Sequence, residues 1–390
     1  MSFRLGAITA LVLMAAPAAA QTTRVEAIAQ EQAKKARALA PEGPNTAEQV
    51  VVRVMSSPLL SGGGGAYPWF GSVFGGSGFA LGGGYLKRLP WDASANAMVG
   101  FSINNSKLLE ARFQLPELWR GRLRVDGAAR WTDAKDVSYF GVGADSQLDD
   151  RDPYDYQPTE LDTTVTLRPA PWAYASAGYT RLDIQAEDAD GDAVAPLAAP
   201  GVGADLGYHV TRVTAAIDWR SSPGYATRGG LYRVSWDRYD ESTGQPYAFS
   251  STEYEVRQLV PLVREQFVLA VRGLVTTTQA DAGQGVPVML APYLGSGSTL
   301  RGFGNRRFTD RHRALLQGEY RWRPSRYMDM ALFVDAGQVA AETRQFRLGD
   351  FETSYGIGLR VHGPRITAFR VELAKSREGW KSVFAGTQTF

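Results

Sequence analysis

"YMDMALFVDAGQV", from Tyr327 to Val339, alternates between two kinds of side chain. One set is apolar and consists of Met328, Met330, Leu332 and Val334. The other set contains two carboxylates and consists of Asp329, Ala331, Phe333 and Asp335. Successive side chains of a β-strand point to opposite faces. The stretch therefore predicts a strand with one apolar face and one face that carries charge.

Two neighbouring stretches repeat this alternation. In "LLQGEYRWR", residues 315–323, Gln317, Glu319 and Arg321 lie opposite apolar and aromatic positions. In "YGIGLRVH", residues 355–362, glycines and Arg360 lie opposite Tyr, Ile, Leu and Val. The pattern fits a soluble β-sandwich, whose apolar face lines a core, and also a transmembrane β-barrel, whose apolar face meets lipid.

The beginning of the chain favours the barrel. Residues 1–20 combine Arg4, an apolar run from Leu5 to Ala16 and a small-residue end, which predicts a secretory signal peptide cleaved before Gln21. The exported chain has no cysteine, so its fold does not depend on disulfides. The net charge of the full 390-residue sequence is only +2, which argues against nucleic-acid binding. No later apolar run is long enough for a membrane helix.

Connection lengths predict an all-β fold, a transmembrane antiparallel β-barrel of about sixteen strands over residues 66–390. Short links such as "LPWDAS" and "RPAPW" alternate with longer polar segments such as 133–157 and 279–310. Short turns of bacterial barrels face the periplasm and long loops face outward. Residues 21–65 predict a periplasmic helix and linker, either a solvated helix or a plug at the periplasmic mouth.

The longest loop, between the expected eleventh and twelfth strands, contains "TLRGFGNRRF", residues 299–308. Its Leu-Arg-Gly-Phe resembles the Val-Arg-Gly-Phe/Tyr tip of the sixth extracellular loop in BamA/TamA-like outer-membrane assembly factors and two-partner-secretion transporters. These proteins form the bacterial surface antigen superfamily. Further resemblances, in the same order along the chain, are "YFGVGAD" (139–145), "IDWRSSPGYATRGGLYRVSW" (217–236), "FVDAGQV" (333–339) and "YGIGLRV" (355–361) with a final Phe390.

The resemblance covers residues 78–390 and implies a lumenal lock. Loop six would fold back into the barrel, where Arg301 would face Glu319, Phe333 and Asp335 on the inner wall. A planar guanidinium suits this task because it binds carboxylates in pairs and stacks on aromatic rings. The other members of the implied site are Gly302, which lets the chain turn tightly, and Phe303. Phe390 would be the terminal signal for barrel assembly.

The resemblance also implies a function at the bacterial outer membrane. The expected activity is insertion or translocation of protein or lipid, although residues 21–65 leave no room for the polypeptide-transport-associated domains that receive client protein in this family. The alternatives are a passive pore or structural barrel, and an outer-membrane hydrolase. Expected partners are outer-membrane lipids and lipopolysaccharide, an unfolded protein or lipid client and a periplasmic partner protein. We expect a monomer that binds no nucleic acid.

Catalytic signals are weak in this sequence. The three histidines, His209, His312 and His362, have no partner at metal-ligand spacing. Glu319 and Asp335 could form the carboxylate pair of a hydrolase, but Arg301 has an implied place between them. The sequence therefore predicts no enzyme, no catalytic residue, no cofactor and no metal site.

Overall fold

The computed structural model describes residues 64–189, 199–263, 265–325, 327–363, 367–385 and 390. The predicted signal peptide, residues 1–20, lies outside these residues. Nearly all of the helix and linker predicted for residues 21–65 also lies outside them.

The described chain is built almost entirely of strands. The first eight are β1 (Gly65–Gly71), β2 (Ala80–Arg88), β3 (Ser94–Ser102), β4 (Lys107–Glu117), β5 (Leu123–Tyr139), β6 (Asp152–Ala170), β7 (Ala173–Asp188) and β8 (Leu206–Asp218). The next five are β9 (Gly229–Glu241), β10 (Phe249–Val263), β11 (Phe267–Ala280), β12 (Tyr293–Leu294) and β13 (Phe308–Thr309). The last five are β14 (His312–Trp322), β15 (Met328–Ala340), β16 (Glu352–His362), β17 (Thr367–Ser376) and β18 (Gly379–Ala385). The helical elements are single turns, α4 (Leu118–Gly121), η1 (Thr343–Gln345) and η2 (Leu348–Asp350).

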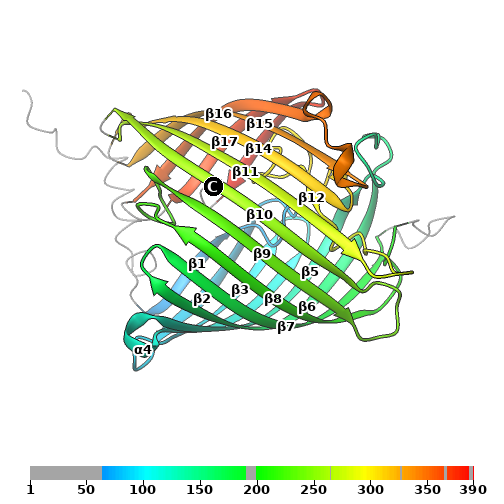
Figure 1. Ribbon diagram of the computed structural model, residues 1–390, viewed down its shortest axis with the longest axis horizontal. Coiled ribbons are helices and arrows are strands. Elements are labelled where there is room, and N and C mark those ends of the chain that lie inside the picture. Colours follow the sequence, from blue (N-terminus) through cyan, green and yellow to red (C-terminus); the bar gives the residue numbers. More distant parts are fainter. Residues whose placement is uncertain (1–63, 190–198, 264, 326, 364–366, 386–389) are drawn as a thin grey trace, which may run out of the picture. The chain divides into compact units, whose positions relative to one another are not determined.

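Sixteen strands form one antiparallel sheet, in which each strand pairs with its neighbours in the sequence and β14 follows β11. The sheet curls into a nearly closed barrel of tilted strands (Figure 1). β12 and β13 form a separate two-stranded sheet within the loop between β11 and β14. Within the described residues, no strand pairing joins β1 to β18. The predicted all-β barrel of about sixteen strands is confirmed.

Side chains alternate between the two faces of the wall as the sequence predicts. On β15, Leu332 and Val334 are 50% and 53% exposed, whereas Ala331 and Asp335 are fully buried. The exposed apolar set continues onto neighbouring strands, for example at Leu316 of β14. The exposed side is therefore the face suited to lipid, and the buried side faces the barrel interior.

One end of the barrel, which we call the short-link end, carries the links after β2, β4, β6, β8, β10, β14 and β16. The other end carries the longest loops, after β5, β7 and β11, and also the short turns after β3 and β17. The predicted loop boundaries were less accurate than the strand order. Residues 133–157 were expected to be loop, but β5 continues to Tyr139 and β6 begins at Asp152. Lys135 and Asp155, at a nitrogen–oxygen distance of 2.7 Å, form an ion pair between these polar extensions. Among the described residues, no helix has the length and apolar character needed to cross a membrane.

Candidate functional site

The loop between β11 and β14, residues 281–311, crosses the barrel interior. Leu290, in its first half, helps to line a cavity of about 520 Å³ together with Glu110 of β4 and Arg212 of β8. Arg301, in its second half, contacts side chains of β14, β15 and β17. Because these strands belong to different parts of the sheet, a loop that contacts both sets lies within the lumen.

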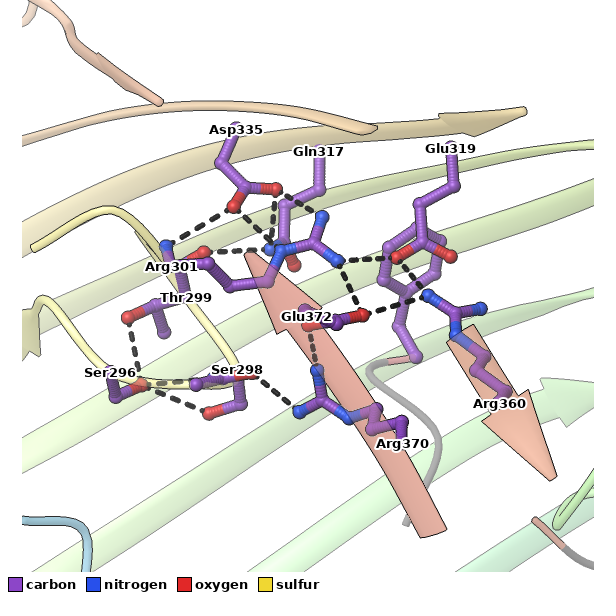
Figure 2. A network of polar contacts seen from close by, with 12 residues as sticks. Ser296, Ser298, Thr299, Arg301, Gln317, Glu319, Asp335, Arg360, Arg370 and Glu372 are labelled. Carbon is purple, nitrogen blue, oxygen red and sulfur yellow. Dashed lines mark hydrogen bonds and ion pairs between the residues drawn. The ribbon is translucent and has the colours of Figure 1, made fainter. Parts of the chain in front are cut away.

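The guanidinium of Arg301 contacts three carboxylates (Figure 2). Nε and Nη2 donate to the two oxygens of Asp335 at 2.8 and 2.6 Å, which is a bidentate pair. Nη1 donates to Glu319 at 2.7 Å and to Glu372 at 3.1 Å. The charged carbon also lies 3.5 Å from the centre of the Phe333 ring, a cation–π contact. Arg301 is fully buried, so all of these contacts are shielded from solvent.

Three further arginines complete the network around these carboxylates. Arg360 of β16 donates to Glu319 at 2.7 Å and to Glu372 at 3.1 Å. Arg321 donates to the second oxygen of Glu319 at 2.7 Å, and Arg370 donates to Glu372. Burying a charge is costly unless it is paired and hydrogen-bonded. Removal of one member would therefore leave the remaining buried charges incompletely compensated.

The backbone holds Arg301 in a tight turn against the wall. The N–H of Phe303 donates to the carbonyl of Leu300 at 3.1 Å and closes the turn. Ser376 of β17 donates to the carbonyl of Gly302 at 2.7 Å. A Cβ atom at residue 302 would lie only 2.7 Å from the Cβ of Ser354, so the close approach to β16 and β17 requires glycine.

The predicted site residues occupy two environments. Arg301, Glu319, Phe333 and Asp335 form direct contacts, as described above. Phe303 instead lies in an apolar cluster with the other buried residues Leu274, Leu294, Leu300, Phe308, Leu315 and Val339. Its ring packs edge-on against Phe308, with 5.2 Å between the ring centres. Phe303 therefore secures the loop beside the charged network and is not part of it.

Sequence reasoning missed Glu372 and Arg370 of β17, and it gave no role to Arg321 and Arg360. The missed signal was the alternation in "AFRVELAKS", residues 368–376, where Arg370, Glu372 and Ala374 lie on one face of the strand. All three are buried, whereas Leu373 between them is exposed. The alternation of inward and outward side chains along β17 is therefore sufficient to identify Arg370 and Glu372 as two further charged residues that face the loop.

Phe390 is buried on the inner side of the barrel wall. Its side chain belongs to a buried cluster with Ala226, Leu259, Val268 and Ala270. The Arg321 guanidinium lies 5.2 Å from the Phe390 ring centre and donates to the main-chain oxygen of Phe390 at 3.2 Å. A role of Phe390 in barrel assembly stays a prediction.

The two arginines that follow in the loop have different partners. Arg307 is buried and donates to Glu378, in the turn between β17 and β18, at 2.6 Å. It also donates to the hydroxyl and carbonyl oxygens of Ser146, between β5 and β6, at 2.8 and 2.7 Å. Arg306 donates to the carbonyl of Val288, within the same loop, at 2.6 Å. The three arginines thus have three different sets of partners, of which those of Arg301 and Arg307 lie outside the loop.

The carboxylates that Arg301 contacts also take part in further hydrogen bonds. Glu319 and Asp335 accept hydrogen bonds from Arg301, and Asp335 also accepts one from Gln317 at 3.0 Å. A general acid or base needs a free position beside the group with which it exchanges a proton. Among the described residues, no group of three or more His, Cys, Asp or Glu side chains could hold a metal ion.

Comparisons with known proteins agree with this architecture. The fold is similar to that of BamA from Haemophilus ducreyi lacking POTRA domains 1–3, with a TM-score of 0.60, 14% identity, and coverage of 83% of this chain and 70% of that chain. It is also similar to CdiB from Escherichia coli, with a TM-score of 0.52, 14% identity, and coverage of 79% of this chain and 57% of that chain.

At this identity the two structures support the fold alone. No curated protein sequence matches the chain. The Omp85 superfamily domain, however, matches residues 90–381, which is most of the described barrel. The chain therefore belongs to the Omp85 superfamily and is an outer-membrane β-barrel.

Proposed function

We propose that this barrel inserts or translocates protein or lipid at the outer membrane, and that the loop between β11 and β14 braces its wall during this work. The observation that carries the proposal is the position of Arg301. One guanidinium joins Glu319 of β14, Asp335 of β15 and Glu372 of β17. These strands lie close to β18, for which no described pairing with β1 exists.

A brace at this position suits a barrel whose wall opens. Where β1 and β18 are not paired, β18 is held by the sheet only through β17, and β17 and β18 together form the free edge of the wall. The contact between Arg301 and Glu372 ties β17 to the loop independently of that ladder. The wall can then keep its shape while a client passes the edge. An unfolded protein or a lipid is the client we propose, delivered by a periplasmic partner protein.

A passive pore is the second candidate, because the lumen retains open space on the wall opposite Arg301. The cavity beside β4–β8 is lined by charged side chains that include Arg112, Asp126, Arg130 and Asp162. Water and ions are compatible with such a lining. A passive pore would need no client protein or lipid and no opening between strands of the wall.

Proteoliposomes that contain the purified protein separate the two candidates. The first measurement is the rate at which a second, unfolded barrel protein inserts, and the second is ion conductance. We expect faster insertion than into empty liposomes, and loss of that acceleration in Arg301→Ala. Conductance without any acceleration would support the passive pore. Hydrolysis of lipid or peptide substrates, absent from Glu319→Gln, would instead support the hydrolase.

A further inference from the structure

The link between β8 and β9, residues 219–228, follows a path that is explained neither by the contacts of Arg301 nor by the proposed function. It leaves the eighth strand and returns to the ninth. Its base is rigid, because Arg220 forms a bidentate pair with Asp218 at 2.9 and 2.8 Å. The N–H of Ser221 also donates to the carbonyl of Arg228 at 3.0 Å, which closes the neck of the link.

The tip of this link reaches strands far away in the sheet. The carbonyl of Gly224 accepts a hydrogen bond from the N–H of Thr367 at 3.1 Å. Thr367 begins β17, the fifteenth of sixteen strands. A link that leaves the eighth strand and contacts the fifteenth has crossed the mouth of the lumen almost to the opposite wall. The link is therefore a strap over the short-link end of the barrel.

Tyr225 fastens the tip of the strap. Its ring stacks on His362 of β16, with 3.8 Å between the ring centres and 9° between the planes. Its hydroxyl donates to Asp329 of β15 at 2.9 Å and accepts from Nε of Arg323 at 2.8 Å. Tyr225, Asp329 and His362 are all buried. A tyrosine in a solvated turn would not need this set of partners.

The remaining strap residues fasten its returning arm. Ala226 packs in the buried cluster with Val268 of β11 and Phe390. Its carbonyl oxygen lies 3.5 Å from Nη1 of Arg321, which donates to it. Thr227 donates to Glu265, in the turn between β10 and β11, at 2.8 Å. The strap thus covers the inner wall from β10 to β17 at this end.

We propose that residues 219–228 form a gate that closes this part of the lumen from the short-link end, and that Tyr225 is its latch. A solute that enters from this end must displace the strap from β14–β17. The gate is held by a different link and latched by different side chains from the Arg301 network, although Arg321 contacts both, through Glu319 and through the carbonyl of Ala226. It does not depend on whether the barrel inserts proteins, translocates lipid or only conducts ions.

Cysteine labelling of the folded full-length protein tests the gate, because the natural chain has no cysteine. Val268→Cys places a thiol beneath Ala226, at a residue that is 4% exposed. The measurement is its rate of reaction with a charged maleimide. In the Tyr225→Ala background we expect the rate to rise at least about tenfold, because the stack and both hydroxyl hydrogen bonds are lost.

Two controls separate gate opening from general loosening. Tyr254→Ala removes an exposed tyrosine from the lipid face of β10 and should leave the rate at Val268→Cys unchanged. Gly244→Cys, in the loop between β9 and β10, should react equally fast with and without Tyr225→Ala. An unchanged rate at Val268→Cys in folded Tyr225→Ala would overturn the gate.

A second variant keeps the test decisive if Tyr225→Ala does not fold. Tyr225→Phe keeps the ring that stacks on His362 and loses only the hydroxyl, so it disturbs the packing least. We expect it to raise the labelling rate about threefold, because the hydrogen bonds to Asp329 and Arg323 are both lost. Labelling at the parent rate in this variant would reject the latch role of Tyr225.

Discussion

The two halves of the loop between β11 and β14 are held by different forces. In the first half, Val288 and Met289 are buried in an apolar cluster with Tyr154, Tyr208 and Phe249 of the wall. In the second half, Arg301 is buried among carboxylates (Figure 2). The same loop is thus attached to one part of the barrel by apolar packing alone, and to another by charge beside the apolar cluster of Leu300, Phe303 and Phe308.

This difference determines how each attachment responds to change. Apolar packing is non-directional and tolerates substitutions of similar volume. A buried bidentate ion pair depends on the geometry of both partners, and loss of one partner leaves a buried charge uncompensated. We therefore expect the ionic attachment to be sharply sensitive to the identity of one residue. The apolar attachment should lose stability gradually as volume is removed.

The largest effect is expected from Arg301→Ala. The variant leaves Asp335, Glu319 and Glu372 buried with fewer counter-charges, which should cost about 3–5 kcal/mol of loop attachment. The barrel ladder itself remains, so we expect a folded protein with a loop that proteases cleave between Gly295 and Arg311. Limited proteolysis at increasing denaturant concentration measures the effect.

Arg301→Lys and Arg311→Ala are the matched variants for this measurement. Lysine keeps the charge but loses the planar fork, so Arg301→Lys should restore little of the protection. Arg311 is an exposed arginine at the end of the same loop, and its replacement should leave the cleavage rate unchanged. Equal protection of Arg301→Ala and the parent would show that apolar packing alone holds the loop.

A smaller effect is expected from Met289→Ala in the apolar half. Met289 is 5% exposed, and truncation of a buried methionine costs about 2–3 kcal/mol through lost packing and the cavity left behind. The same proteolysis assay should show cleavage in the first half of the loop. Met289→Leu, which conserves volume, should behave like the parent. Greater damage from Met289→Leu than from Met289→Ala would contradict an attachment by packing.

The sequence predicted the ionic half of this comparison better than the apolar half. Arg301 belongs to a short motif, and strand parity placed Glu319, Phe333 and Asp335 on the inward face. The apolar attachment has no comparable signal, because Val288 and Met289 lie in a segment without a repeating pattern. Their partners are distant in sequence, and only the curled sheet brings Tyr154 and Phe249 near them.

The fold shows the same limit of sequence reasoning. Alternation in β14, β15 and β16 predicted inward and outward faces, because a period of two is fixed by strand geometry. The predicted ends of β5 and β6 were wrong, because the polar extensions of these strands resemble a loop in composition. Cross-strand ion pairs such as Lys135 with Asp155 stabilise these extensions as strands. The contacts of Tyr225 in the strap could not be predicted from the sequence, because its partners lie on strands that only the curling of the sheet brings near.

A double-mutant cycle between Arg301 and Asp335 sharpens the comparison further. Arg301→Ala, Asp335→Asn and the double variant are compared by loop proteolysis. Because the two side chains form two hydrogen bonds in a buried site, we expect a coupling energy of about 1–2 kcal/mol. Met289 and Asp335 share no contact in the structure as described, so their cycle should show additive effects. A coupling energy of zero between Arg301 and Asp335 would contradict the lumenal lock.

The smallest effect is expected at Arg306, which connects the two halves. Its guanidinium donates to the carbonyl of Val288 at 2.6 Å and lies 4.4 Å from the ring centre of Tyr293. Its backbone φ of 53° is in the left-handed region, which costs a residue with a side chain about 1 kcal/mol relative to glycine. Arg306→Ala loses the side-chain contacts and keeps this strain, so we expect it to weaken loop attachment by about 1 kcal/mol. Arg306→Gly loses the same contacts but relieves the strain, so its net effect should lie within about 0.5 kcal/mol of the parent.

If the loop arginines instead served to bind lipopolysaccharide phosphates outside the barrel, Arg306→Gly and Arg306→Ala would behave alike. Both variants would then weaken loop attachment as much as Arg301→Ala does. That outcome would contradict a loop whose two halves are held separately.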